Sequence, residues 1–205
     1  MEKMKKIYAF KALLFVAGLL VGGWFFMPWK QVGEAVLLSA ANRLPGPGGM
    51  AYSTVRSARG SFVVDNLEVK NLMGMLDLSF NTLTVEPDAV ASLLSMSPTC
   101  RVAFTGAVVG GRIPGVTPGN GRVVVSFNAQ GVFLDSLRSD GELSVGGSLL
   151  VNPSAGKVAW ADVVMDVRSE AFEEALPVIA SFTGLPLHRE RPGRWTLRRP
   201  RGSER

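Results

Sequence analysis

The sequence predicts a mainly β protein with a few helices, in which an N-terminal transmembrane helix precedes an antiparallel sheet or open half-barrel. Three observations support this prediction. One long apolar run lies near the N-terminus, most of the remaining chain alternates apolar and polar residues with a period of two, and 23 glycines are spread among many turns. With 205 residues, the chain has room for one membrane-proximal segment and one domain of ordinary size.

The apolar run is long enough to cross a membrane. Residues 12–29 carry no charge, and a run counted from Ile7 covers about 34 Å at about 1.5 Å per residue. The run ends in four bulky aromatic residues, where a signal peptidase requires small side chains: Trp24, Phe25, Phe26 and Trp29. Aromatic residues are typical of the membrane interface, so we predict an uncleaved anchor over 7–29 with these four residues at its interface. Cleavage near the small residues 39–41 is the alternative.

The charge around the apolar run predicts its orientation. Lysines stand on its N-terminal side, at positions 3, 5, 6 and 11. The positive-inside rule therefore places residues 1–6 in the cytoplasm and everything after about residue 30 in the periplasm. The predicted location is the inner (plasma) membrane, with a periplasmic C-terminal domain.

The segment after the anchor is predicted to hold a short helix and a linker. Residues 29–44 show apolar positions at helical spacing, and the stretch 44–50 contains two prolines and three glycines. We therefore assign 30–50 to a juxtamembrane helix and a Pro/Gly linker, 51–199 to a β-rich periplasmic domain, and 200–205 to a basic tail.

Alternating residues predict the strands of this domain. The predicted strand segments are 67–70, 76–85, 101–108, 123–128, 142–151, 158–167 and 194–199. A change of phase between Phe80 and Leu83 predicts a β-bulge. The inward positions are expected to be Val102, Phe104, Val108, Val123, Val125, Phe127, Leu143, Val145, Trp195 and Leu197. One apolar and one polar face per strand is typical of an antiparallel sheet.

Two helices are predicted between the strands. The first is predicted over residues 86–96, with Pro87 near its first turn. The second is predicted over residues 169–184, where Glu170, Glu173 and Glu174 lie in the first turns and are favoured by the positive end of the helix dipole.

Composition excludes several classes of function. One cysteine, Cys100, and one histidine, His188, exclude an internal disulfide framework and the usual clustered metal sites. The net charge of +5 is concentrated at the two ends of the chain, so no basic domain face for nucleic acid is expected. We predict no cofactor, no metal and no nucleic-acid partner.

No motif in the sequence carries a convincing catalytic signature. The S-x-x-K match at 154–157 and the segment 118–121 (PGNG) are interpreted as turns, because neither has the companion elements or the helix that its chemistry requires. Asp162 and Asp166 share one side of a strand and are interpreted as solvated, as is His188. The protein is therefore not expected to be an enzyme.

The order and spacing of these elements resemble the type II secretion system protein N family. The resemblance rests on the aromatic–Pro–Trp end of the anchor, on VEPDAVASLLS followed by VAFTGAVVGGRIPG, on GELSVGGSLLVNPSAGKVAWADVVMDV and on the terminal LPVIASFTGLPL. It implies a bitopic inner-membrane protein with an AsmA-like periplasmic body of extended antiparallel strands. It also implies a structural or assembly role beside other membrane or periplasmic proteins of the secretion system, and it offers no catalytic residues.

Two hypotheses of function remain open at this stage. In the first, the chain is an inner-membrane assembly component of the type II secretion pathway, and the arginines of the last strand form its candidate partner-contact region: Arg194, Arg198 and Arg199. In the second, an AsmA-like or lipopolysaccharide-transport-like open sheet handles membrane lipid in its apolar concavity. The two differ in whether inward residues such as Val123 and Leu143 pack under helices or line an open groove.

Overall fold

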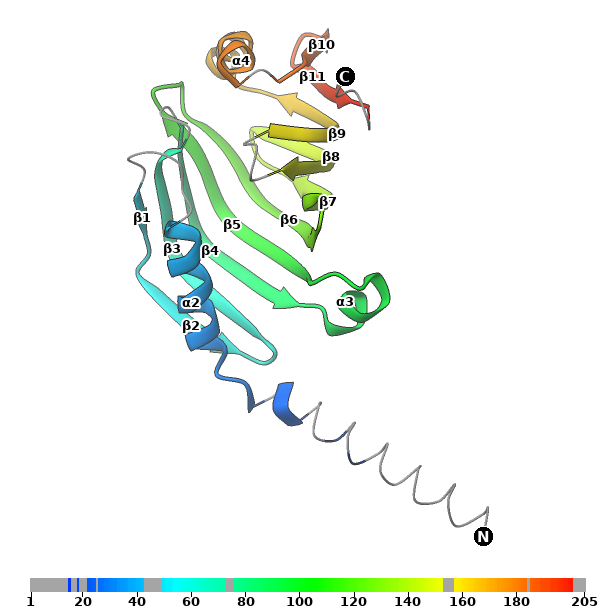
Figure 1. The fold of residues 1–205 in the computed structure, drawn as a ribbon. Coiled ribbons are helices and arrows are strands. Elements are labelled where there is room, and N and C mark those ends of the chain that lie inside the picture. The colour runs from blue at the N-terminus through cyan, green and yellow to red at the C-terminus, as the bar shows by residue number, and fades with distance from the viewer. Residues whose placement is uncertain are drawn as a thin grey trace.

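The computed structural model describes residues 15, 18, 22–24, 26–42, 49–72, 76–152, 157–183 and 185–200. Within these residues the strands form one 11-stranded antiparallel sheet in the order β1-β3-β4-β5-β6-β7-β8-β9-β11-β10, with β2 also paired to β3. The sheet is open, since β1 and β2 lie at one edge and β10 at the other (Figure 1). The predicted mainly β fold with an open antiparallel sheet is confirmed.

The described helices are α2 (Trp29–Ala41), α3 (Ala89–Ser95) and α4 (Glu170–Thr183). The strands are β1 (Gly49–Ala51), β2 (Thr54–Ala58), β3 (Ser61–Leu72), β4 (Leu76–Pro87), β5 (Thr99–Gly111), β6 (Val116–Asn128), β7 (Gly131–Ser139), β8 (Leu143–Asn152), β9 (Lys157–Val167), β10 (Leu187–Arg191) and β11 (Arg194–Arg199).

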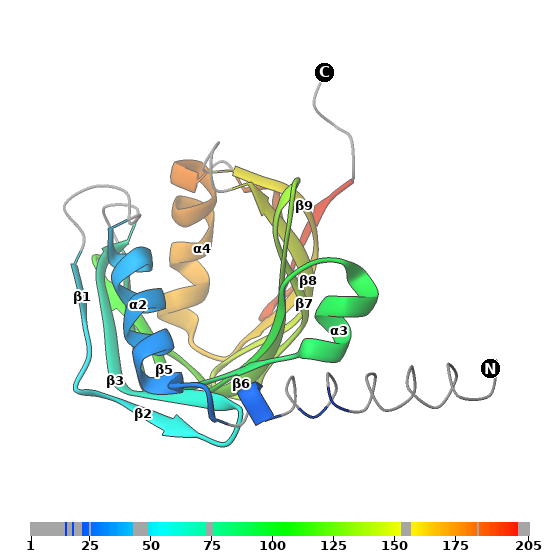
Figure 2. The ribbon, with the colours of Figure 1, turned by 60° about the horizontal axis from the view of Figure 1, so that its bottom comes forward.

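Two helices lie inside the curve of the sheet and divide its core (Figure 2). Helix α2 packs on β2 and β3 through a cluster that includes Trp29, Val55 and Phe62. Helix α4 packs near the opposite edge, where Phe172 and Trp195 belong to a second cluster. The apolar side chains on the inner sides of both helices, such as Leu37 and Leu176, are thereby removed from water, which is the main source of helix stability.

Some predicted segments lie outside the described residues: 1–6, most of the predicted span 7–29, much of the linker, the turn 153–156 and the tail 201–205. Among the residues that are described, none of the helices combines the length and apolar character needed to cross a membrane.

Residues with a left-handed backbone lie within several strands and explain some differences from the predicted strands. They include Asn66 in β3, Gly106 in β5, Gly119 in β6, Ser136 in β7 and Gly147 in β8. After Gly106 in β5 the facing of the following residues is reversed, so Ala107 is buried and Val108, predicted to point inward, is 40% exposed. The predicted bulge between Phe80 and Leu83 is wrong, because β4 keeps its register with both neighbours at that point.

Backbone irregularities within strands also explain why some strands were not predicted from the sequence. In β7 the register shifts between Leu134 and Leu137, which breaks the alternation that identifies a strand. The segment 118–121, predicted to be a turn, lies within β6. The short or highly charged edge strands β1, β2 and β10 were likewise not predicted, since their alternation is too brief or too polar to stand out.

Both predicted helices in the domain are present. Helix α3 begins later than predicted: Pro87 ends β4, and the side chain of Asp88 caps the helix by accepting a hydrogen bond from the Ala91 amide at 2.9 Å. Helix α4 keeps the predicted acidic first turn with Glu170 and Glu173.

Candidate functional site

The aromatic end of the apolar run folds back onto the domain. The rings of Trp24 and Trp29 meet edge to face at 4.9 Å, and the Trp29 indole N–H donates to the Trp24 carbonyl at 3.1 Å. The Trp29 side chain is only 2% exposed and belongs to the core beneath α2. This buried indole joins the end of the run directly to the sheet.

Close backbone approach seats α2 on the strands. A Cβ atom at Gly33 would lie 2.7 Å from the Phe62 ring and 2.9 Å from a Val55 methyl carbon, so only glycine lets the helix come this near. The Lys30 amide also donates to the Ser57 hydroxyl at 2.9 Å. The helix predicted to be juxtamembrane is therefore packed against the β-rich body.

The other predicted interface aromatics are placed differently. Phe26 is 90% exposed, Trp24 is half-buried, and Phe25 lies outside the described residues. An exposed phenylalanine near the end of the predicted span fits an interfacial position, but the contact of these residues with lipid stays a prediction.

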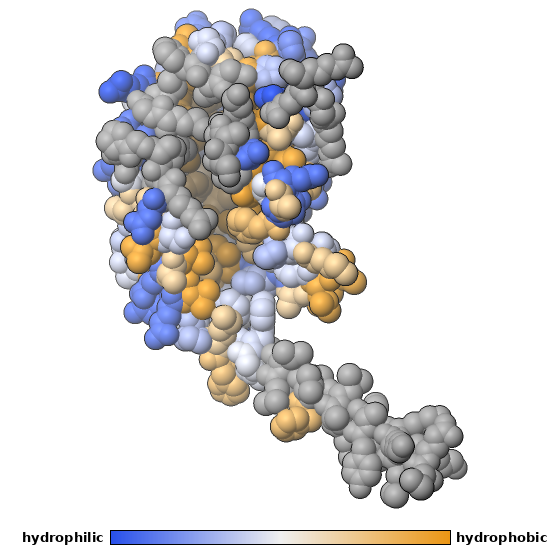
Figure 3. All heavy atoms as spheres, viewed as in Figure 1, coloured by the Kyte–Doolittle hydropathy of each residue, from blue (hydrophilic) through white to orange (hydrophobic). Residues whose placement is uncertain are grey.

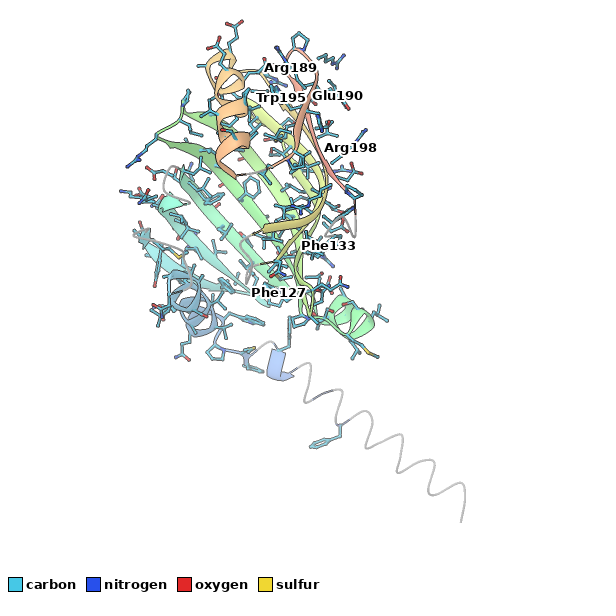
Figure 4. The ribbon with its side chains drawn as sticks, turned by 45° about the horizontal axis from the view of Figure 1, so that its top comes forward. Phe127, Phe133, Arg189, Glu190, Trp195 and Arg198 are labelled. Atoms are coloured by element: carbon cyan, nitrogen blue, oxygen red, sulfur yellow. The ribbon has the colours of Figure 1, made fainter. Side chains whose placement is uncertain are left out.

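The predicted arginine contact region lies on β11, between β9 and β10 (Figure 4). Arg194 approaches Glu190 at 3.3 Å and Asp166 at 3.7 Å, while Arg198 approaches Asp162 at 3.7 Å and Glu190 at 3.8 Å. Two guanidinium groups therefore face three carboxylates, and the basic character expected of this surface is neutralised.

This pairing also explains the two aspartates that the sequence placed on one side of a strand. Asp162 pairs in register with Arg198, and Asp166 with Arg194, so each carboxylate lies opposite an arginine across the β9–β11 ladder. Arg199 points to the opposite face of β11, where the buried Trp195 and Leu197 confirm the predicted inward direction. Exposed ion pairs of this kind contribute about 0–1 kcal/mol, and partner contact by these arginines stays a prediction.

A carboxylate on α4 fastens the last hairpin to the helix. Glu173 accepts hydrogen bonds from the Gly193 amide at 2.8 Å and from the Trp195 indole at 3.2 Å, and it pairs with Arg189 at 2.8 Å. The Gly193 amide, followed by the Trp195 and Arg189 groups, holds the pKa of Glu173 below its ordinary value of 4.5. The sequence assigned this glutamate only to the helix dipole, because its partners lie about twenty residues further along the chain.

The lowered pKa predicts an acid-dependent loss of stability. Glu173 stabilises the fold fully above its unfolded pKa of about 4.5, and this stabilisation declines as pH falls through the lower folded value. Glu173→Gln keeps an acceptor oxygen but removes the charge. We expect its melting temperature to lie below that of the natural protein at pH 7 and the difference to shrink as the pH falls below about 4.5. A difference that stays constant from pH 7 to pH 3 would contradict the assignment.

The residues predicted to point inward, which distinguish an assembly role from lipid handling, have two kinds of surroundings. Leu143 is buried and Val145 packs beside it under α4. Val123 and Val125 are half-buried on the stretch of β6 between the two helices, and Phe127 is 48% exposed. Figure 3 looks onto this face and shows apolar residues recessed between the flanking parts of the molecule. One end of the sheet is thus covered by a helix, while the middle keeps an apolar strip.

One exposed apolar surface was not predicted from the sequence. Helix α3 and its C-cap residue expose four large apolar side chains: Val90, Leu93, Leu94 and Met96. The signal was present, because residues 89–96 contain no charge, but the apolar positions of a predicted helix are normally assigned to the core.

The remaining candidate residues are solvated or unremarkable in their surroundings. His188 is exposed on β10, and burial raises the pKa of the half-buried Cys100 thiol. Within the described ranges, no group of three or more histidine, cysteine, aspartate or glutamate side chains could hold a metal ion.

Comparison with known proteins identifies a family. A family model described as "Type II secretion system protein GspN-like, Synergistales" matches residues 5–199. Searches of curated proteins and of solved structures give no match.

Proposed function

Because the chain belongs to the GspN-like family of type II secretion system proteins, we propose that it is a single-pass inner-membrane accessory component of that pathway. Its role is structural and non-enzymatic. Residues 7–29 anchor it in the inner membrane, residues 1–6 stay in the cytoplasm, and the sheet lies in the periplasm, where it docks to other secretion-system membrane or periplasmic proteins.

The observation that carries this proposal is the direct connection between the apolar run and the sheet. Trp29 ends the run and is buried in the core, and α2, which begins at this residue, packs on β2 and β3. Movement or force at a membrane anchor would therefore be passed to the sheet without an intervening flexible linker. Such a connection suits a protein that holds neighbouring components at a fixed distance from the membrane.

The sheet offers two different edges for docking. Strand β10 carries His188, Arg189, Glu190 and Arg191, and a charged edge of this kind discourages strand addition. Its arginines instead provide polar contacts for a partner. At the other edge, β1 and β2 cover successive parts of β3 and are themselves unpaired on their outer sides within the described sheet. Strand addition is therefore more favourable at this N-terminal edge.

The proposal is tested by site-specific photo-crosslinking in cells that carry the secretion system. A photoreactive residue at Arg198, which is exposed on β11, is compared with one at Val178, which is exposed on α4. We expect secretion-system proteins to be captured from position 198 and not from 178, and deletion of the gene to lower secretion. Unchanged secretion together with no captured component of the system at either position, or at the β2 edge, would overturn the proposal.

A second candidate function is lipid handling of an AsmA-like or lipopolysaccharide-transport-like kind. The half-buried strip around Val123 and Val125 favours it, since an apolar surface left between two helices could receive an acyl chain. Mass spectrometry of the same purified chain distinguishes the two functions. A lipid bound at a fixed stoichiometry that is lost in Val125→Asp would favour lipid handling.

A further inference from the structure

Helix α3 turns its apolar side away from the protein. Val90, Leu93, Leu94 and Met96 are 70%, 80%, 82% and 94% exposed. Single exposed apolar residues are common, but four within one short helix and its cap form a patch, which marks a binding surface in soluble and membrane-associated proteins. We call these four residues the apolar tip.

The polar side of α3, in contrast, is fixed to the sheet. Asp88 caps the helix and pairs with Arg101 of β5. The Ser92 hydroxyl accepts a hydrogen bond from the Thr99 amide at 2.8 Å and donates to the Asp88 carbonyl at 2.6 Å. This arrangement is the reverse of an ordinary surface helix, which buries its apolar side. The base of α3 is held by polar contacts, and the apolar tip is left for something outside the chain.

The apolar tip lies beside the aromatic end of the N-terminal run. Trp24 lines, together with Leu93, Met96 and Phe127, one open groove of about 600 Å³. Figures 1 and 2 both place α3 at the end of the sheet from which the N-terminal segment extends, and Figure 3 shows apolar residues gathered on α3. The apolar tip is therefore continuous with the surface where the predicted anchor leaves the domain.

The tip of the β2–β3 hairpin adds a basic residue to this end. A Cβ atom at Gly60 would lie 2.9 Å from the Trp24 indole nitrogen, so the hairpin touches the same tryptophan, and the neighbouring Arg59 is exposed. A basic residue beside exposed apolar side chains adds electrostatic attraction to an anionic phospholipid surface. The acidic Glu86 and Asp88 line a neighbouring groove with Trp24, where Asp88 is paired with Arg101.

We propose that the apolar tip of α3 is a second membrane contact. It inserts its side chains into the headgroup region on the periplasmic side of the inner membrane and fixes the orientation of the sheet on the membrane. This inference rests on the proposed function, because the anchor brings the apolar tip to the bilayer. A single transmembrane helix can itself tilt and rotate in the bilayer, and the domain joined to it would move with it. With α3 as a second point of contact beside Trp24, the long strands stand at a defined angle to the membrane.

The bilayer is favoured over a protein partner by position and charge. The patch has no charged residue from 89 to 96 to select a particular partner, and it shares a groove with Trp24, two residues before Phe26, which is 90% exposed. Membrane contact requires only apolar side chains at an interface, and helices of this kind bury them about 5–10 Å into the headgroup region.

The test uses the full chain with Cys100→Ala, reconstituted in vesicles of phosphatidylethanolamine and phosphatidylglycerol. A single cysteine carrying an environment-sensitive fluorophore replaces Leu94 in the apolar tip, Phe15 in the predicted span, or Val178 on α4. We expect nitroxide-labelled lipids to quench the probes at 94 and 15 at least twofold more than the probe at 178. Adding Leu93→Asp is expected to reduce quenching at 94 to the level at 178, while quenching at 15 is unchanged.

The possible results separate this inference from the proposed function. Quenching at 15 without quenching at 94 would overturn the membrane contact of α3 and leave the anchor intact. Absence of quenching at both positions would overturn the anchor as well. A probe at 94 that is shielded from aqueous iodide but not quenched by the labelled lipids would show that protein, either a second copy or a partner, covers the apolar tip, and this result would also overturn the inference.

Discussion

Replacement of Trp29 by alanine is expected to destabilise the domain by about 3–5 kcal/mol. The indole is 2% exposed, packs against the Trp24 ring and belongs to the cluster that holds α2 on β2 and β3. Truncation leaves a cavity that α2 cannot close, because Gly33 already places the helix in contact with Phe62. It also removes the hydrogen bond to the Trp24 carbonyl, which links the apolar run to the domain.

This prediction is checked by thermal unfolding of the full chain in a mild detergent. A loss of about 3–5 kcal/mol corresponds to a fall in melting temperature of roughly 6–20 °C for a chain of this size. The matched control is Phe26→Ala, three residues earlier, where the side chain is 90% exposed and the expected change is below about 0.5 kcal/mol. Equal effects at the two positions would mean that Trp29 does not pack in the core.

Trp29 also shows why the site could be predicted only in part. The sequence placed Trp29 with Trp24, Phe25 and Phe26, because composition identifies where an apolar run ends. It does not indicate which aromatic residue turns back toward the sheet. That choice depends on Val55 and Phe62, which follow at least twenty-five residues later. Contacts between distant segments leave little trace in local periodicity.

The strands were predictable where their alternation is unbroken. Segments such as 158–167 and 194–199 match β9 and β11 closely, since these strands pair with few interruptions. The prediction failed in β7 and in the second half of β5, where Ser136 and Gly106 adopt positive φ and change which face the following residues occupy. A period-two pattern assumes a regular backbone, so each left-handed residue shifts it.

The apolar tip of α3 was missed for a related reason. An apolar helical pattern predicts a helix but gives no sign of the direction in which its apolar side faces. In this protein the direction is set by Asp88, Ser92 and Arg101, which tie the opposite side of α3 to the sheet. These polar contacts leave the apolar side chains of α3 on its exposed side.

Gly147 is a position where a substitution is expected to distort the sheet directly. Its φ is +134°, and a Cβ atom there would lie 2.1 Å from the Asp162 carbonyl oxygen and 2.8 Å from the Val163 Cα. Both neighbours are backbone atoms of β9, so relief requires separation of β8 from β9. Steric strain and the unfavourable φ together predict a loss of about 3 kcal/mol or more for Gly147→Val.

The adjacent glycine provides a control that differs in one structural respect. A Cβ atom at Gly146 meets only the Leu137 carbonyl, at 3.9 Å, and its φ is not in the left-handed region. Gly146→Val therefore adds a β-branched side chain to an ordinary strand position, with an expected change within about 1 kcal/mol. We expect the melting temperature of Gly147→Val to fall by roughly 6 °C or more, while that of Gly146→Val stays within about 4 °C of the natural protein. If both variants melted alike, the pairing of β8 with β9 would not depend on a glycine in the left-handed conformation at position 147.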